Sequence, residues 1–367
     1  MGKLVSAFDL IPPRESKETR MPDTVSSERT SKMAWARPGV ETVLPGVHRI
    51  ALPLPFDALT AVNVYVLETA DGLLMVDGGW AVPEGRRQLE ESLGDIGFAV
   101  ADIAEILVTH MHRDHYTLGS VLRDELGCVL RLGAPESENL AALGTDPKGG
   151  SAQYAMLREA GADVLVDAWH EWLDSQPDDA SHYATPSAWI ADGDVIDRGG
   201  VRLRAVLTPG HTRGHVVFVD EERGLLFSGD HVLPTITPSV GFEPVRDRLA
   251  LRAFLASLTK VAELGDLSLM PAHGPVGMSS GERIAALIAH HDERLRATLA
   301  QVDDGETAFK VASDLKWTRR EHAHSDLEPY SRALAVMETE YHLELLQDRG
   351  LVSSRMVGGV RFYYRTA

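Results

Sequence analysis

The chain has 367 residues, of which 44% are apolar and 25% are charged, a balance typical of a globular protein that folds in water. This composition excludes collagen-like, low-complexity and largely disordered classes. A formal charge of −18, from 36 basic and 54 acidic residues, disfavours general binding to nucleic acid or anionic lipid.

The predicted elements divide the chain into three parts. Residues 1–40 are polar and lack periodicity, so we predict a mobile N-terminal arm. Residues 41–280 alternate short β-like runs with helical stretches, and we predict one catalytic domain there. Strands are expected at 47–54, 61–67, 73–76, 106–108, 188–190, 201–207, 216–219 and 225–227, with helices at 83–93 and 246–264.

Two further segments are mainly helical. Residues 134–185 show several helical patterns between polar breaks, which indicates a helical insertion whose aromatic side chains could roof an apolar pocket. Residues 281–367 are expected to form a C-terminal helical domain. Its first helix is expected from 281 to 302. Its last two helices, at 307–315 and 329–349, precede a hairpin across Gly358-Gly359, which is the outline of a winged helix.

No signal-peptide pattern occurs in residues 1–20, and no apolar run reaches the roughly 18 residues of a membrane span. We therefore expect a cytoplasmic protein without membrane association. Cys128 is the only cysteine, so an intrachain disulfide or a multi-cysteine metal site is excluded. Any metal must be bound by some of the 15 histidines together with carboxylates.

The densest chemical motif is Thr109-His110-Met111-His112-Arg113-Asp114-His115, directly after a buried strand. In extended backbone, residues two apart point the same way, so His110 and His112 can share one metal ion. If a helix begins near Asp114, that carboxylate and His115 can face a second ion.

Three more ligand-type side chains follow strand ends in small-residue turns, namely His211, Asp230 and His273. Each alone has an ordinary structural explanation, because polar residues are common in such turns. Together they supply the additional ligands that zinc needs.

These motifs resemble the metallo-β-lactamase superfamily, whose members carry His-x-His-x-Asp-His followed by separate His, Asp and His ligands. The resemblance covers about residues 40–280 and implies an α+β fold, the αβ/βα sandwich of two mixed sheets with helices outside and metals at one edge. It also implies that Asp230 bridges two metal ions. The first ion would be bound by His110, His112 and His211, and the second by Asp114, His115 and His273.

A bridging Asp230 resembles glyoxalase II, lactonases and phosphodiesterases more than the antibiotic-degrading members. The histidine that the flavodiiron branch replaces by glutamate is retained, which favours two Zn²⁺, with iron or manganese as alternatives. The C-terminal outline resembles the β-lactamase-like protein 2 type hydrolases, a subgroup that includes an endoribonuclease.

Four other residues are candidates around the site. Asp77 resembles the family's buried aspartate that accepts a hydrogen bond from a metal-bound histidine, and His215 is a second candidate for supporting the ligands. His231 and Tyr116 are candidates for substrate contact, although plain packing explains either one equally simply. Five other histidines lack partner spacing and are expected at the surface, namely His290, His291, His322, His324 and His342.

We therefore predict a binuclear zinc-dependent hydrolase in which hydroxide, formed from water shared by the two ions, attacks a thioester, ester or lactone carbonyl. Asp114 and Asp230 are the catalytic candidates that orient this nucleophile. The alternative is a metal-dependent phosphodiesterase or endoribonuclease with a nucleic-acid-binding tail, and a third hypothesis is a metal-binding scaffold without turnover.

The basic residues of the tail argue against the nucleic-acid alternative. Only Arg355, Arg361 and Arg365 lie on the expected wing, and a nucleic-acid-binding domain usually shows a stronger basic stripe. We therefore expect a small-molecule acyl substrate as the partner, and a tail that packs or forms a homodimer beside the active site.

Overall fold

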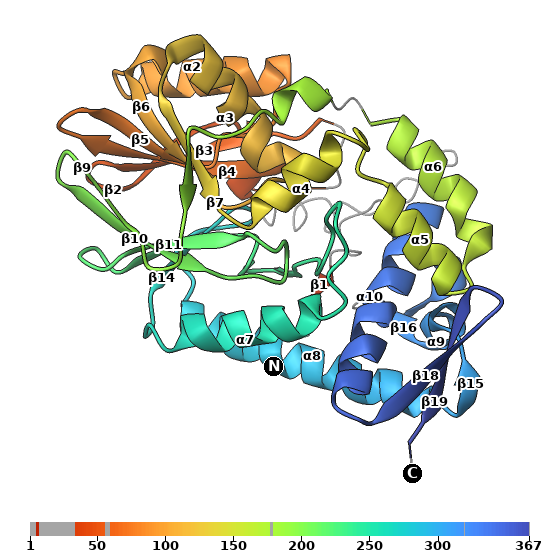
Figure 1. Cartoon of the computed structure of the whole chain (residues 1–367). Helices are drawn as coiled ribbons and strands as arrows, with labels where there is room; N and C mark the ends of the chain where they lie inside the picture. The colour runs from red at the N-terminus through yellow and green to blue at the C-terminus, as the bar shows by residue number, and fades with distance from the viewer. Residues whose placement is uncertain (1–4, 7–33, 56–58, 177–178, 319, 367) are drawn as a thin grey trace, which may run out of the picture.

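The computed structural model describes residues 5–6, 34–55, 59–176, 179–318 and 320–366. Two mixed sheets pack face to face, helices cover their outer faces, and the C-terminal helices lie beside the second sheet (Figure 1). The αβ/βα sandwich predicted from the sequence is confirmed.

The first sheet has seven strands in chain order, antiparallel from the first to the fourth and parallel from the fourth to the seventh. They are β2 (Gly39–Leu44), β3 (Val47–Pro53), β4 (Ala61–Thr69), β5 (Gly72–Val76), β6 (Ile103–Leu107), β7 (Val129–Gly133) and β8 (Ala188–Ile190). The run of apolar and β-branched residues in β4 is buried on both faces, as expected for a central strand.

The second sheet has five strands in the order β14-β12-β11-β10-β9, of which only β12 and β14 are parallel. They are β9 (Val195–Arg198), β10 (Val201–Leu207), β11 (Val216–Asp220), β12 (Leu225–Gly229) and β14 (Ser268–Pro271). Inward side chains of both sheets, including Tyr65, Phe218 and Phe227, form the core between them.

Four helices cover the sandwich: α2 (Pro83–Asp95), α3 (Arg113–Leu126), α7 (Ala250–Ala262) and α8 (Ser280–Ala300). Helix α2 begins at a proline, whose fixed φ suits a first helical turn. Helix α3 ends at Gly127 in the left-handed conformation. The Ser279 side chain accepts a hydrogen bond from the Glu282 amide and caps α8. Helices α2 and α3 pack on the first sheet, and α7 and α8 on the second.

Helices occupy most of residues 134–185, as the periodicity predicts: α4 (Glu136–Leu143), α5 (Ser151–Glu159) and α6 (Val166–Asp174). Trp169 on α6 is buried and stacks on Tyr330, with ring centroids 5.3 Å apart. The aromatic residues of this segment therefore pack against the C-terminal helices as well as near the site.

The C-terminal region contains β15 (Asp304–Glu306), α9 (Ala308–Asp314), β16 (Lys316–Trp317), β17 (His322–Ala323), α10 (Pro329–Asp348), β18 (Val352–Val357) and β19 (Val360–Arg365). The strands form a β15-β19-β18 sheet and a β16-β17 pair. The assignment of this region as a winged helix and the domain boundary at residue 280 stay predictions. Apolar side chains of α7, α8, α9 and α10 belong to one continuous buried cluster.

The expectation that the five unassigned histidines lie at the surface is wrong for three of them. His291, His324 and His342 are buried, whereas His322 is exposed. His291 and His342 face each other across α8 and α10, with ring centroids 5.5 Å apart. Burial of these rings follows from helix–helix packing, which their spacing in the sequence does not reveal.

The expected N-terminal arm lies mostly outside the described residues. Within them, β1 (Val5–Ser6) pairs in parallel with β13 (Ile236–Thr237), residues Ala34–Ala36 form a 3₁₀ turn, and β2 already begins at Gly39. The boundary of the arm at residue 40 stays a prediction, and β2 begins one residue before it. Among the described helices, none combines the length and apolar character needed to cross a bilayer.

Candidate metal centre

The predicted ligands all follow strands that end at one edge of the sandwich. His110 and His112 lie between β6 and α3, while Asp114 and His115 are in the first turn of α3. Three others follow strands of the second sheet, in the order His211 after β10, Asp230 after β12 and His273 after β14. Both sheets thus contribute side chains to the same edge.

These seven side chains form two adjacent groups. In each group the candidate ligand atoms lie within 4.8 Å of one another. The groups consist of His110, His112, His211 and Asp230, and of Asp114, His115 and His273. The structure therefore brings together all seven residues singled out in the sequence, in a cluster of the kind that binds a pair of metal ions.

Hydrogen bonds at the outer ring nitrogens show which nitrogens face inward. His112 Nε2 and His211 Nδ1 each lie 2.7 Å from a backbone carbonyl oxygen, and His273 Nδ1 lies 2.8 Å from another. A ring nitrogen must carry hydrogen to donate to a carbonyl, so the opposite nitrogen of each ring carries a lone pair. These lone pairs point into the cluster.

The inward atoms are crowded, and those of the first group carry lone pairs. His211 Nε2 lies 3.1 Å from His110 Nε2 and 3.0 Å from His112 Nδ1. In the second group the buried atoms His115 Nε2 and His273 Nε2 have no hydrogen-bond partner among the described residues. Converging lone pairs of this kind repel one another unless a cation lies between them, so the residues fit bound divalent metal.

Asp230 faces both groups. Its Oδ2 lies 3.6 Å from His211 Nε2, while its Oδ1 lies 3.7 Å from His115 Nε2 and 3.4 Å from His273 Nε2. Asp114 Oδ2 lies 3.4 Å from His273 Nε2, which belongs to the second group. This geometry matches the bridging position that the resemblance implies for Asp230.

The electrostatics of the two groups differ. Burial lowers the pKa of His110 and His211, which keeps these imidazoles neutral, as metal ligands must be. Burial opposes the charged form of His115 as well, but the carboxylates of Asp114, Asp77 and Asp230 outweigh it and raise its pKa to about 10. The second group thus stabilises positive charge, which a metal ion supplies in place of a proton.

Asp77 lies where the resemblance implies. Its Oδ2 accepts a hydrogen bond from His115 Nδ1 at 2.9 Å, and its Oδ1 accepts from the Thr109 amide at 2.8 Å and the Thr109 hydroxyl at 2.9 Å. Gly78, the next residue, lets the chain lie directly against α3. Any side chain at Gly78 would collide with the backbone of Gly119 in that helix, so only glycine permits this approach.

His215 supports the cluster from behind. Its Nε2 accepts a hydrogen bond from the Asp230 amide at 3.1 Å, and its Nδ1 lies 2.8 Å from the Thr208 hydroxyl. The ring stacks on that of His110, with centroids 5.1 Å apart. His215 therefore fixes the backbone of one predicted ligand and the ring plane of another.

The substrate-contact expectations for His231 and Tyr116 stay predictions, and the positions of both side chains favour packing. His231 is fully buried and packs on Phe254, with ring centroids 5.1 Å apart. Tyr116 is also fully buried, and its hydroxyl donates to the carbonyl of Ala184. Packing, the simpler explanation for both residues, accounts for their positions.

The sequence interpretation missed three contributors to the cluster. The Thr109 hydroxyl lies 3.1 Å from His110 Nδ1 and relays that contact to Asp77. The carbonyls of Ser239 and Phe242 accept from His211 and His112. A hydroxyl residue directly before the first ligand was a usable signal for Thr109, but a backbone carbonyl carries no residue-type signal.

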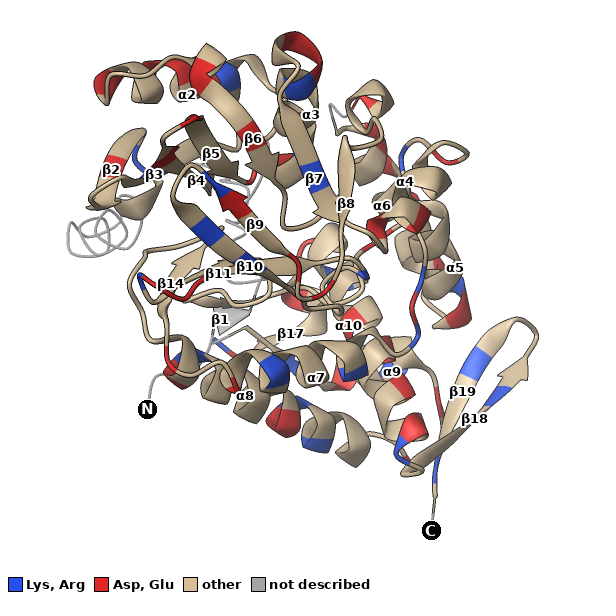
Figure 2. Ribbon diagram, turned by 60° about the vertical axis from the view of Figure 1, so that its left-hand side comes forward, with Lys and Arg blue, Asp and Glu red and all other residues tan. Residues whose placement is uncertain are grey.

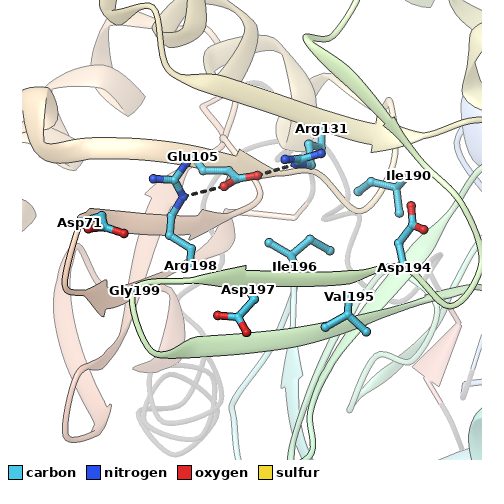
Figure 3. A pocket seen from close by; sticks show the side chains of 10 residues that line it. All are labelled: Asp71, Glu105, Arg131, Ile190, Asp194, Val195, Ile196, Asp197, Arg198 and Gly199. Atoms are coloured by element: carbon cyan, nitrogen blue, oxygen red, sulfur yellow. Dashed lines mark hydrogen bonds and ion pairs between the residues drawn. The ribbon is translucent and has the colours of Figure 1, made fainter.

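A separate pocket of about 520 Å³ lies toward the opposite ends of β5 and β6 (Figure 3). Asp71, which precedes β5, lies on its wall, and Glu105 of β6 is bound there by Arg131 and Arg198. None of the seven clustered residues lines this pocket. Glu105, Arg131 and Arg198 are engaged with one another and none of the predicted ligands lies there, so the pocket is not the candidate metal site.

The sandwich and its His/Asp cluster define the fold class and a candidate metal centre. The chain belongs to the metallo-beta-lactamase superfamily, whose family model matches residues 58–273. It is 27% identical over 250 residues to the lactamase-like protein aptB of Emericella nidulans, covering 68% of this chain and 63% of that protein. The chain therefore spans less than two thirds of that relative.

Two further similarities extend over more of the chain. The atrochrysone carboxyl ACP thioesterase of Aspergillus fumigatus is 26% identical, over 76% of this chain and 71% of that protein. The crystal structure of a metallo-beta-lactamase family protein from Thermus thermophilus superimposes with a TM-score of 0.68 at 28% identity, covering 89% of this chain and all of that one. The latter similarity includes part of the region beyond residue 280.

Proposed function

We propose that the chain is a binuclear zinc hydrolase that acts on the carbonyl of a small thioester, ester or lactone substrate. The observation that carries this proposal is the position of Asp230, whose two carboxylate oxygens each face one group of histidines. A site for a single metal ion would need no carboxylate that faces a second group of ligands. Cytoplasmic action and a homodimer belong to the proposal as expectations.

The residues of this chain have distinct roles in the proposed reaction. When bound, the pair of divalent cations supplies a water of lowered pKa and a Lewis acid for the carbonyl oxygen. The side chain of Asp114 is 15% exposed and that of Asp230 10%, so both carboxylates reach the edge of the cluster. Either can accept a proton from the attacking water or hold that water in line with the carbonyl.

Acyl substrates fit the residues beside the cluster. A thiolate leaves without a strong acid, because thiols ionise near pH 8.5. The Phe242 ring lies 5.9 Å from that of His112 and 5.9 Å from that of Trp169. The partly buried Phe242 ring beside His112 suits an acyl substrate, and the name of the fungal thioesterase relative supports the same substrate class.

The nucleic-acid alternative receives no support from the hairpin. Its basic residues lie as separate bands and form no continuous stripe along β18 and β19 (Figure 2). The Arg361 guanidinium is only 16% exposed and pairs with Glu159 of α5 at 3.4 Å. A guanidinium engaged inside the protein is poorly placed to bind a phosphate backbone.

The proposal is tested by metal analysis of the purified chain together with a panel of acyl-thioesters, lactones, β-lactams and phosphodiesters. We expect two zinc ions per chain and fastest turnover of thioesters or lactones. Asp230→Ala should lower metal content and hydrolysis together, whereas Asp220→Ala, a buried aspartate of β11, should leave the metal content unchanged. Preferred turnover of phosphodiesters, or unchanged rates in Asp230→Ala, would contradict the proposal.

A further inference from the structure

One short segment orients two of the predicted ligands in the first group. Residues 239–243, here called the carbonyl loop, follow β13 and precede α7. The Ser239 carbonyl accepts a hydrogen bond from His211 Nδ1 and the Phe242 carbonyl accepts one from His112 Nε2, both at 2.7 Å. The direction in which both imidazole lone pairs point therefore depends on where this loop lies.

The carbonyl loop is bound to α10, far along the sequence. The buried Tyr341 hydroxyl donates to the Gly241 carbonyl at 2.8 Å. Gly241 has a φ of 64°, and a side-chain carbon there would lie 2.5 Å from the Tyr341 hydroxyl oxygen, so the ring lies directly against the loop. The Gly241 amide donates in turn to the Gly210 carbonyl at 2.8 Å, next to His211.

A second contact with α10 fixes the chain just after the loop. Arg246 Nη2 lies 2.6 Å from Glu344 Oε1 and 3.1 Å from Glu340 Oε1, and both glutamates are buried on α10. Broken ion pairs in such an environment are costly, so this contact limits how far the loop can move. Helix α10 thus contacts the carbonyl loop at Gly241 and the chain just after the loop at Arg246.

The second group is oriented without α10. His115 Nδ1 donates to Asp77, and His273 Nδ1 donates to the Ala61 carbonyl at 2.8 Å. Ala61 is the first residue of β4 in the first sheet, and Asp77 directly follows β5. A change in α10 therefore reaches the first group directly and leaves the supports of the second group in place.

We propose that Tyr341 is a positioning residue of the metal centre: through the Gly241 carbonyl it fixes the carbonyl loop, and through that loop the imidazoles of His112 and His211. The inference rests on the proposed two-metal function and adds that the C-terminal region completes one of the two sites. Partners that orient metal ligands in this way change metal affinity by about 10- to 100-fold when they are removed.

The test is a zinc titration of the metal-free full-length chain, monitored by calorimetry, for the wild type and Tyr341→Phe. We expect the variant to bind one ion about tenfold more weakly and the other with unchanged affinity. Thr339→Val is the matched control, because Thr339 is buried on the same helix and its hydroxyl donates to the Ala335 carbonyl within α10 at 2.8 Å. It should bind both ions as the wild type does.

A second variant keeps the test decisive if Tyr341→Phe folds poorly. Gly241→Ala pushes the loop away from Tyr341 while leaving the sequence of α10 unchanged, and it should weaken the same single ion. Unchanged affinities in a folded Tyr341→Phe, equal loss at both sites, or the same loss in Thr339→Val would overturn the inference alone. A wild-type chain that binds fewer than two ions would contradict the proposed function and overturn this inference with it.

Discussion

At the scale of single residues, Asp77 shows how local backbone geometry serves the cluster. Its φ of 63° lies in the left-handed region that non-glycine residues seldom adopt. In that conformation its carboxylate accepts hydrogen bonds from the amide and hydroxyl of Thr109 and from His115. The strained conformation is held because one carboxylate satisfies three buried donors.

We expect Asp77→Asn to weaken zinc binding by about 10- to 100-fold at the second group. Asparagine replaces one carboxylate oxygen by an NH₂ group, which donates. This group would face a donor on Thr109 or on His115, and the hydrogen bond at that position would be lost. The unpaired donor should also lower the free energy of unfolding by about 1–3 kcal/mol. Zinc titration and urea unfolding of the metal-free chain measure the two effects separately.

Asp220→Asn is the matched control for this change. Asp220 is a buried aspartate whose carboxylate pairs with Arg223 at 2.8 Å, away from the cluster. Its substitution should lower the free energy of unfolding without changing zinc affinity. Wild-type zinc affinity in Asp77→Asn would refute the assigned role of Asp77.

Glu136 makes the free energy of unfolding depend on pH near neutrality. It is fully buried, accepts hydrogen bonds from the Thr212 hydroxyl and the Asn139 amide, and shares Asn139 with the buried Glu243. Burial raises its pKa to about 7, from an ordinary value of 4.5. The folded chain thus favours protonated Glu136 more strongly than the unfolded chain does.

The stabilising contribution of this proton is complete below pH 4.5 and is lost as the pH rises toward 7. At about 1.4 kcal/mol per pH unit, the loss amounts to about 3 kcal/mol. Glu136→Gln removes the titration, so we expect the wild type to lose stability relative to this variant between pH 5 and pH 8. Urea unfolding of both proteins at these two pH values measures the difference, and a constant difference would refute the assignment.

The candidate site could be predicted from the sequence to the extent that it depends on side-chain type. His110, His112, Asp114 and His115 are metal-ligand types in one short motif, and the strand-end turns supply the rest. The supports could be predicted less well, because the carbonyls of Ser239 and Phe242 orient the rings regardless of which residues carry them. Burial of His231 and Tyr116 likewise depends on neighbours remote in sequence.

At the scale of elements, long helices with clear end signals were predicted well. The helix expected at 329–349 is α10 at Pro329–Asp348, starting at its proline, and the one expected from 281 to 302 is α8 at Ser280–Ala300. The helix expected from 246 begins only at Ala250, because Arg246 pairs with glutamates of α10 instead of continuing a helix.

Strands β9 and β7 were not predicted from their own residues. Strand β9, Val195–Arg198, has mostly exposed or partly exposed residues and lies at the edge of its sheet, where its pairing with β10 determines its conformation. Strand β7, Val129–Gly133, was also missed, since its Arg131 interrupts the apolar run. That arginine pairs with Glu105 on the neighbouring strand β6, a partner visible only in the folded chain.

At the scale of the whole molecule, the C-terminal region is part of the structure that holds the site. Side chains of α10 pack with those of α7, α8 and the second sheet in one buried cluster. The region also supplies Tyr341 to the carbonyl loop. A chain that ends before α9 would lose both the apolar cover and this contact.

We therefore expect removal of residues 302–367 to impair zinc binding and hydrolysis of even a small thioester. Each Val or Leu side chain left uncovered costs about 1.5–3 kcal/mol, and the deletion uncovers partners of Val336, Leu343 and Leu346, among others. Solubility, thermal unfolding and zinc content of the shortened chain measure the effect. A soluble truncated chain with two ions and full thioester turnover would show that the tail is dispensable for the site.

The ligands also join the two halves of the sandwich. His110 and His112 follow a strand of the first sheet and His211 follows one of the second, 101 residues away from His110 along the chain. An ion shared by these side chains is a cross-link between the sheets at one end. At the other end, Glu105 of the first sheet binds Arg198 of the second at 2.6 Å. With ions bound, the two sheets would therefore be joined at both ends. Without the ions, the ion pair between Glu105 and Arg198 would still join the sheets at the other end.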